Sequence, residues 1–325
     1  MTAAASAAVV VPTHDRADLL ERLVAALERQ ETQRPFSVVV VDDGSRDETR
    51  TVLEKLAAST RLPLIPLRLD PGRGPATARN LGWRATDADV VAFIDDDCVP
   101  APGWLEALVR AAARGGMAQG TTLPDPAQAS VSGPFSRTLE VTEPTGYYQT
   151  CNMAYRREVL ERLGGFDERF RHPTGEDTDL AWRALEDGVE AEFVGAAIVY
   201  HDVRPSNFVA HLRDTRRWEG VVLAVRLHPR LRDRFYRRWF WKPSHPPAMA
   251  AAMGLALAVG SNSSFVRRLL GLALTAPYVR YRTRVLPLEG GPRRRVAAIP
   301  LALVADLAEV GVLASASARY RTLLL

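Results

Sequence analysis

The chain has 325 residues, and 47% of them are apolar, which is enough for a substantial core and excludes a globally disordered protein. Its net charge of +4 hides an asymmetry, because the first 202 residues carry 32 acidic against 21 basic groups and the remainder carries 6 against 21. An acidic front suits metal ions and a basic back suits phosphate, so the two parts are expected to meet different partners.

The first part of the chain alternates short apolar runs with amphipathic helices. A capping box of Ser45 and Glu48 is predicted to start the helix after the second run. Four Val-rich runs are predicted to be strands buried on both faces of a mostly parallel sheet: residues 7–11, 36–41, 64–69 and 90–94. This order predicts a doubly wound α/β domain, in which ligands bind beyond the carboxyl ends of the strands.

The alternation fades over residues 123–145, which predicts a long polar loop or hairpin of the kind that serves as a flap. A strand, a helix over residues 157–163 and a Gly-Gly turn are expected next. A helix from Glu176 toward Gly188 follows, and then two short strands, residues 191–194 and 197–201. We expect the first domain to occupy residues 1–205.

Residues 206–325 are predicted to form an Arg-rich helical region. Its apolar segments at 246–260 and 269–279 are too short to span a bilayer singly, and Asp306 and Glu309 interrupt the run at 296–316. No run reaches about 18 uninterrupted apolar residues, so no certain transmembrane helix is predicted. Apolar helices edged by Arg and Trp fit an anionic membrane surface, and this interleaving argues against nucleic acid.

Acidic residues follow the predicted strands. Asp95 and Asp97 come after the fourth strand and are expected to face one ion, because strand side chains alternate, with Asp96 pointing elsewhere or toward a ribose. Oxygen ligands favour Mg²⁺ or Mn²⁺, although a turn or helix cap would also explain these residues. Asp42 and Asp43 end the second strand, where they either read a nucleotide base and ribose or form an ordinary Asp-Gly turn.

Three further positions are candidates for chemistry. Arg79 lies in the Gly- and Ala-rich segment 72–82 and would neutralise a diphosphate, or the segment simply starts a helix. Glu176 and Asp177 open a helix whose dipole favours the ionised form, so they provide either a general base or a cap with Thr174. His201 ends an apolar strand at the same edge, as a metal ligand or as a structural histidine.

These segments together resemble the family 2 glycosyltransferases, the inverting enzymes of the GT-A fold, over roughly residues 6–205. Six segments carry the likeness in the family's order: VVVPTHDR, VVVVDDGSRDET, GPATARNLG, FIDDDCVPAPGWL, CNMAYRREVLERLGGFDERF and GEDTDLAWR. The resemblance implies a GT-A sheet, doubly wound and mostly parallel, with a C-terminal helical and membrane-associating extension. It also implies a nucleotide-diphospho-sugar donor, with a UDP-sugar favoured.

The resemblance assigns roles to individual residues. The donor-binding residues it implies are Pro12, Thr13, Asp15, Asp42, Asp43, Arg79, Asn80 and Asp96. Asp43 would read the base and Arg79 would lie near the diphosphate, while Asp15 departs from the Asn that is more usual there. The metal ligands for Mn²⁺ or Mg²⁺ would be Asp95, Asp97 and His201.

The same resemblance makes Asp177 the general base of a Glu-Asp motif with Glu176, which takes a proton from the acceptor hydroxyl as that hydroxyl inverts the anomeric carbon. Only Arg217 and Trp218 match the Gln-(Gln/Arg)-x-Arg-Trp motif of processive members, so transfer of one or a few sugars is expected. The acceptor is expected to be a lipid-linked or cell-surface glycan precursor. The enzyme would lie at the cytoplasmic face of the bacterial plasma membrane, held there by its C-terminal region.

Three rival interpretations remain. Residues 95–99 also fit the D-x-D-x-(T/V) nucleophile motif of the haloacid dehalogenase-type phosphatases, which normally lies at the first strand. A non-catalytic membrane scaffold with the same fold would bind no nucleotide sugar. A sugar-nucleotidyltransferase shares the fold but usually carries a Gly-rich N-terminal loop, which is absent here.

Overall fold

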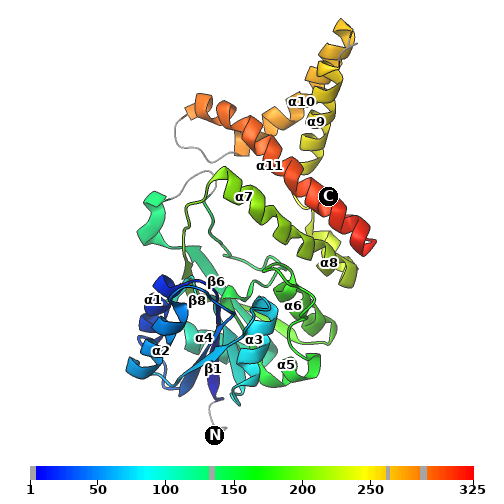
Figure 1. Ribbon diagram of the computed structural model, residues 1–325. Coiled ribbons are helices and arrows are strands. Elements are labelled where there is room, and N and C mark those ends of the chain that lie inside the picture. Colours follow the sequence, from blue (N-terminus) through cyan, green and yellow to red (C-terminus); the bar gives the residue numbers. More distant parts are fainter. Residues whose placement is uncertain (1–4, 132–135, 261–263, 286–290) are drawn as a thin grey trace. The chain divides into compact units, whose positions relative to one another are not determined.

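The computed structural model describes residues 5–131, 136–260, 264–285 and 291–325 (Figure 1). The chain divides into two compact units. The first unit comprises Met1–Ser130 and Arg137–Arg204, and the second comprises Val131–Ser136 and Pro205–Leu325.

The first unit is built on a mixed sheet whose strand order is β3-β2-β1-β4-β7-β6-β8-β5. The strands are β1 (Ala7–Thr13), β2 (Phe36–Asp42), β3 (Leu64–Arg68), β4 (Val90–Phe93), β5 (Cys98–Pro100), β6 (Gly116–Pro124), β7 (Met153–Arg156) and β8 (Glu190–His201). Strands β3, β2, β1 and β4 are parallel neighbours, whereas β7 runs antiparallel between β4 and β6. The mostly parallel α/β sheet predicted from the sequence is therefore confirmed.

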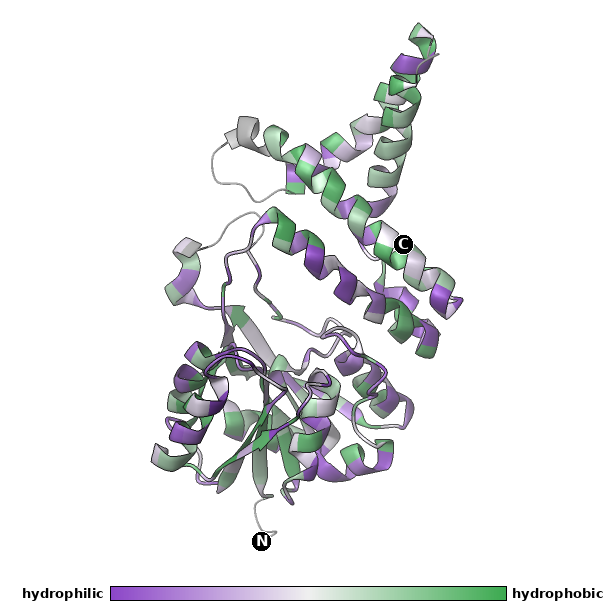
Figure 2. Ribbon diagram, in the orientation of Figure 1, coloured by the Kyte–Doolittle hydropathy of each residue, from purple (hydrophilic) through white to green (hydrophobic). Residues whose placement is uncertain are grey.

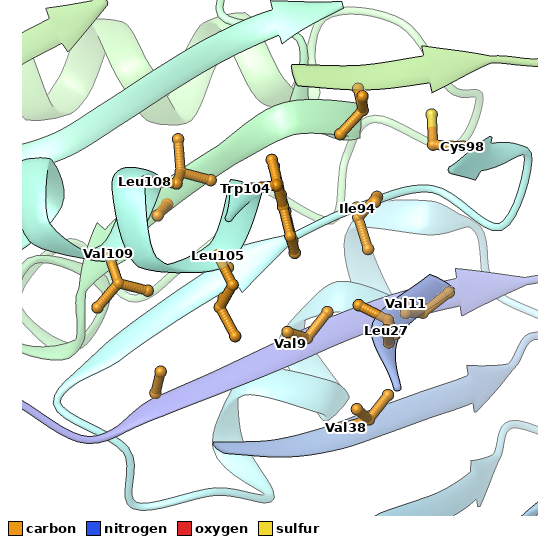
Figure 3. Packing of buried hydrophobic residues seen from close by; sticks show 14 of the residues in the cluster. Val9, Val11, Leu27, Val38, Ile94, Cys98, Trp104, Leu105, Leu108 and Val109 are labelled. Carbon is orange, nitrogen blue, oxygen red and sulfur yellow. The ribbon is translucent and has the colours of Figure 1, made fainter. Parts of the chain in front are cut away.

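Side chains of successive β1 residues point to opposite faces of the sheet, and helices cover both faces. The helices are α1 (Ala17–Leu27), α2 (Thr49–Ser59), α3 (Pro75–Arg84), α4 (Trp104–Gly115), α5 (Arg157–Leu163) and α6 (Glu176–Glu186). Val9 and Val11 pack with Leu27 and with Trp104 and Leu105 of α4, as Figure 3 shows. The opposite face has its own cluster, formed by β1 and β2 valines with side chains of α3, α5 and α6.

Two local predictions are wrong. Ser45 does not cap α2, which begins at Thr49, because its N–H donates to Asp42 Oδ1 (2.8 Å) and its hydroxyl accepts from the Asp15 N–H (2.9 Å). The two predicted short strands form one strand, β8. Its pairing with β6 shifts register from Gly120–Val194 to Thr121–Ile198, so the interval that suggested a turn is a bulge.

The second unit is helical. Its helices are α7 (Phe208–Asp214), α8 (Glu219–Leu227), α9 (His245–Val259), α10 (Phe265–Val285) and α11 (Gly291–Tyr320). Helices α9 and α10 cross closely, since a Cβ on Gly254 would lie 2.3 Å from the Gly271 carbonyl oxygen. Much of their surface is apolar, as the green ribbon of Figure 2 indicates.

Helix α11 resolves the interrupted apolar run of the sequence. Within the described part of the chain, Val296–Tyr320 is the one helix that is long and apolar enough to cross a membrane. Its two acids are buried rather than exposed: Asp306 accepts from Ser244 (3.0 Å) and Tyr278 (2.7 Å), and Glu309 accepts from Lys242 Nζ (2.7 Å). Both carboxylates are therefore paired with cations inside this unit, Asp306 with Arg282 and Glu309 with Lys242, instead of facing the surroundings of the helix.

Candidate functional site

The carboxyl ends of β1 and β4 meet at one edge of the sheet and bring Thr13 beside the three aspartates. The Thr13 hydroxyl donates to Asp96 Oδ2 at 2.7 Å, and both side chains are buried. Burial raises the pKa of Asp96 to about 7, and the neighbouring Asp97 adds to this increase. Asp96 is thus held against β1, while Pro12, just before Thr13, is only partly buried.

Asp97 and His201 form the part of this edge that suits a cation. Strand β5 pairs with β8 so that Cys98 lies opposite His201, and Asp97 Oδ1 lies 3.8 Å from His201 Nε2. His201 Nδ1 lies 2.9 Å from the Asp202 carbonyl oxygen, and an N–H at Nδ1 leaves the lone pair of Nε2 directed toward Asp97. Metal-ligating histidines typically make such a hydrogen bond through the ring nitrogen that does not bind the metal, so the donor set fits a divalent cation.

Cys98 is a ligand-capable residue that the sequence analysis did not select. One ligand atom each from Asp97, Cys98 and His201 lie within 4.8 Å of one another. The thiol is buried, and its pKa is raised by the hydrogen bond with Cys151 and by burial. The thiol therefore stays protonated, and oxygen and nitrogen atoms remain the available donors.

Arg79 occupies the centre of the site. Its guanidinium group donates to Asp95 Oδ1 (2.7 Å, from Nη2) and to Glu176 Oε1 (2.9 Å, from Nη1), and its side chain is 5% exposed. Two carboxylates thus bind the guanidinium group of Arg79, which the sequence analysis expected near a diphosphate. We assign Arg79 a positioning role, because it ties the end of β4 to the start of α6.

Glu176 and Asp177 begin α6 after Gly175, whose φ of 98° lies in the left-handed region that favours glycine. Thr174 makes no cap, because its hydroxyl donates to the Pro173 carbonyl. Glu176 is buried and Asp177 is partly exposed. Burial raises the pKa of both groups, and that of Glu176 reaches about 8 because Asp177 is close. Asp177 is therefore the carboxylate that a substrate can reach.

The acids after β2 hold the adjoining loops. Asp42 is buried, and Arg68 pairs with it. Asp43 accepts from the N–H of Arg73 (2.6 Å, at Oδ1) and of Gly74 (2.8 Å, at Oδ2), which fixes the loop before α3. The base-reading role of Asp43 stays a prediction.

Asp15 and Asn80 also make internal contacts. Asp15 adopts φ 51°, and its Oδ1 accepts from the Arg46 N–H at 2.7 Å. Asn80 is 2% exposed; its amide donates to the Phe166 carbonyl (2.8 Å) and its Oδ1 accepts from the Phe166 N–H (2.9 Å). Asn80 therefore anchors the Gly-Gly-Phe turn, and its donor-binding role stays a prediction.

Two arginines at this edge were also missed from the sequence. Arg16 Nη1 lies 3.5 Å and Arg204 Nη2 lies 3.2 Å from Asp97 Oδ2. The sequence offered one indication of their role, which was that each lies close in the chain to a predicted site residue. Arg16 is the last residue of the VVVPTHDR segment, and Arg204 comes soon after His201.

Comparisons with known proteins identify the family of the chain. The model of Glycosyl transferase family 2 matches residues 8–164, and that of Glycosyl transferase family group 2 matches residues 90–288. A pre-mycofactocin glycosyltransferase of Mycobacterium tuberculosis is 30% identical over 221 residues, which cover 60% of this chain and 42% of that protein. A chondroitin synthase of Escherichia coli is 26% identical over 271 residues, which cover 71% and 39%. The chain thus spans about two fifths of the length of these curated relatives.

Solved structures share the fold. The mannosyltransferase PcManGT from Pyrobaculum calidifontis, in complex with GDP-Man and Mn²⁺, superposes with a TM-score of 0.63 at 21% identity, covering 95% of this chain and 88% of that one. S. aureus TarS 1-349 superposes with a TM-score of 0.54 at 16% identity, covering 97% and 91%. At these identities the likeness establishes the GT-A fold.

Proposed function

Since the chain belongs to the family 2 glycosyltransferases, we propose that it transfers a sugar from a nucleotide-diphospho-sugar to an acceptor hydroxyl, with inversion at the anomeric carbon. One observation carries the proposal. Asp97 and His201 lie together where a cation can bind, and Arg79 hydrogen-bonds both to Asp95, two residues before Asp97, and to Glu176 at the start of α6. Related structures contain GDP-Man with Mn²⁺, UDP or UDP-GlcNAc, which supports a nucleotide-sugar donor.

Asp97, His201 and Asp95 are the residues proposed to hold Mn²⁺ or Mg²⁺, which when bound supplies positive charge that stabilises the departing diphosphate. Asp97 and His201 offer an oxygen and an oriented ring nitrogen to one point. Asp95 is 29% exposed and keeps its second oxygen available, because Oδ1 accepts from Arg79.

Asp177 is the proposed general base. Its carboxylate is partly exposed, and Oδ1 accepts from the Thr178 N–H at 2.7 Å, which fixes its orientation. A base here removes the proton of the acceptor hydroxyl as that oxygen attacks the face opposite the diphosphate, which inverts the carbon. Glu176 is buried behind it and is held by Arg79, so we assign it a positioning role.

The phosphatase alternative has less support. A phosphatase needs the first aspartate of the motif as a nucleophile, normally after the first strand. Here Asp95 follows the fourth strand, β4, and Arg79 donates a hydrogen bond to one of its oxygens. The scaffold alternative accounts neither for a partly exposed Asp177 at the start of α6 nor for the oriented His201 near Asp97.

We also propose that the second unit binds the anionic cytoplasmic surface of the plasma membrane, where the acceptor would be a lipid-linked or cell-surface glycan precursor. Large apolar side chains of α9 and α10 are exposed, among them Val259 (81%), Phe265 (75%) and Leu270 (61%). Arg267 and Arg268 lie beside them and would contact anionic headgroups. Figure 2 shows how little of α9 is polar.

A donor screen tests the proposal. Thermal shift with Mn²⁺ and UDP-, GDP- or dTDP-sugars should show stabilisation by one donor, and EDTA should abolish it. The Asp177→Asn variant should keep that stabilisation and lose transfer by about 10²-fold or more. Normal turnover by Asp177→Asn would refute our choice of base, and no response to any donor would refute the proposed donor class.

A further inference from the structure

Two arginine side chains approach Asp97, the carboxylate next to His201. Arg16 and Arg204 approach the same oxygen, Asp97 Oδ2, at 3.5 Å and 3.2 Å. Arg204 also exchanges two backbone hydrogen bonds of 2.9 Å with Arg137, and the Arg16 N–H donates to Thr49 Oγ1 at 2.9 Å. Backbone contacts thus bring these cationic side chains to one place.

Two guanidinium nitrogens at this place lack a hydrogen-bond acceptor. Arg16 Nη1 and Arg204 Nη2 are buried, and neither makes a hydrogen bond despite its ion-pair distance from Asp97, although Arg204 Nε donates to Asp202 Oδ2 at 3.2 Å. The pKa of Arg137 is lowered by burial and by the Arg16 guanidinium. Buried N–H groups without acceptors are rare in proteins, so they point to an anion that binds at this position.

Asp97 is also the carboxylate best placed for a cation. A divalent cation and two guanidinium groups at one carboxylate repel each other. With a cation at Asp97, Arg204 keeps only the Asp202 contact of its Nε and Arg16 keeps only the longer one with Asp96 (3.9 Å), so Nη1 of Arg16 and Nη2 of Arg204 can take another anion. The planar guanidinium fork matches a phosphate group. Arg79 does not meet this need, because two carboxylates already hold its guanidinium group.

We propose that Arg16 and Arg204 form an anion clamp for a substrate phosphate, with Asp97 as their counter-ion until a cation takes it. This inference deepens the proposed function and rests on it for the identity of the substrate. The phosphate belongs either to the donor diphosphate or to a phosphorylated acceptor, and both present the same chemistry to the two guanidinium groups.

Binding measurements on Arg16→Gln and Arg204→Gln test the clamp. Mn²⁺ binding is followed by the electron paramagnetic resonance signal of the free ion. Binding of inorganic diphosphate, UDP, GDP and farnesyl phosphate at saturating Mn²⁺ is followed by calorimetry. Arg110→Gln on α4, with a side chain 66% exposed, is the matched control. Each clamp variant should weaken diphosphate binding at least about tenfold and leave Mn²⁺ affinity unchanged or higher, because a competing cation is gone.

The opposite signs separate the clamp from a structural role. Variants that lose Mn²⁺ affinity along with phosphate affinity, or that bind inorganic diphosphate like the wild type, overturn the clamp. The Arg16→Lys variant keeps the charge without the fork and should fall between Arg16→Gln and wild type. If UDP or GDP binding weakens together with diphosphate binding and farnesyl phosphate binding does not, the phosphate is the donor's; if farnesyl phosphate binding weakens together with diphosphate binding and nucleotide binding does not, it is the acceptor's. A wild type that binds inorganic diphosphate but no nucleotide refutes the proposed donor and leaves the clamp standing.

Discussion

Replacing Glu176 with Gln tests how the buried carboxyl group of the site is charged. Burial raises its pKa from 4.5 to about 8, helped by Asp177 and opposed by Arg79. The fold therefore holds this proton more tightly than the unfolded chain does. Its contribution to the free energy of unfolding is complete below about pH 4.5 and is lost as the pH rises through about 8.

The size of the effect follows from that difference in pKa. Each pKa unit is worth about 1.4 kcal/mol, so a rise from 4.5 to about 8 allows at most about 5 kcal/mol. Local rearrangement and entry of water around the ionised group reduce this, and we expect about 1–3 kcal/mol. Gln keeps the shape, and its carbonyl oxygen still accepts from Arg79, but it does not ionise. Wild type should therefore lose about 1–3 kcal/mol more stability than Glu176→Gln between pH 5 and pH 8.

Urea unfolding of both proteins at the two pH values, with a chelator present, measures this difference. The matched control is Glu54→Gln on α2, whose side chain is 60% exposed, and its stability relative to wild type should not depend on pH. If wild type and Glu176→Gln differ by the same amount at pH 5 and at pH 8, Glu176 ionises normally in the fold and the reasoning fails.

Three further predictions follow from other contacts. Asp97→Asn should abolish Mn²⁺-dependent stabilisation by the donor, and a full thermal shift in this variant would remove Asp97 from the metal site. Asn152→Ala should cost about 3–5 kcal/mol in urea unfolding, because it leaves the Trp104 indole N–H and two buried carbonyls without partners; a cost below about 1 kcal/mol would contradict this. The Leu269→Asp and Leu270→Asp variants should no longer float with anionic vesicles in a flotation assay, while their donor binding should not change. Unchanged flotation would show that this surface does not contact the membrane.

The strands and helices of the first unit were largely predictable, because burial on both faces produces Val-rich runs such as Val38–Val41. The sequence located α5 at its observed bounds, Arg157–Leu163. The bulge of β8 was not predictable, since it is fixed from a distance: the Asn152 amide donates to the Thr121 and Ala197 carbonyls at 2.8 and 2.9 Å. The Ser45 capping box failed for a similar reason, because Asp42 competes for the Ser45 N–H.

The candidate site was predictable in membership more than in pairing. The rule that strand ends converge brings Asp97 and His201 to one edge. Which arginine pairs with which carboxylate depends on how segments far apart in the sequence fold together, since Arg79 pairs with Glu176, 97 residues away. Arg16 lay beside a recognised segment, but its residue type alone did not show that its guanidinium group would be buried against Asp97.

Ion pairing distinguishes the acidic residues that stabilise the first unit from those available for chemistry. Asp42 pairs with Arg68, Asp179 with Arg183 and Asp125 with Arg22, so these carboxylates stabilise the fold. Asp177 differs, because among the described residues no ion pair holds it at close range, and burial raises its pKa although Arg79 and the N–H groups of Thr178 and Thr150 oppose that increase. A partly exposed carboxylate with a raised pKa has the basicity that a general base requires. Acid density alone would have ranked Asp42 and Asp177 equally.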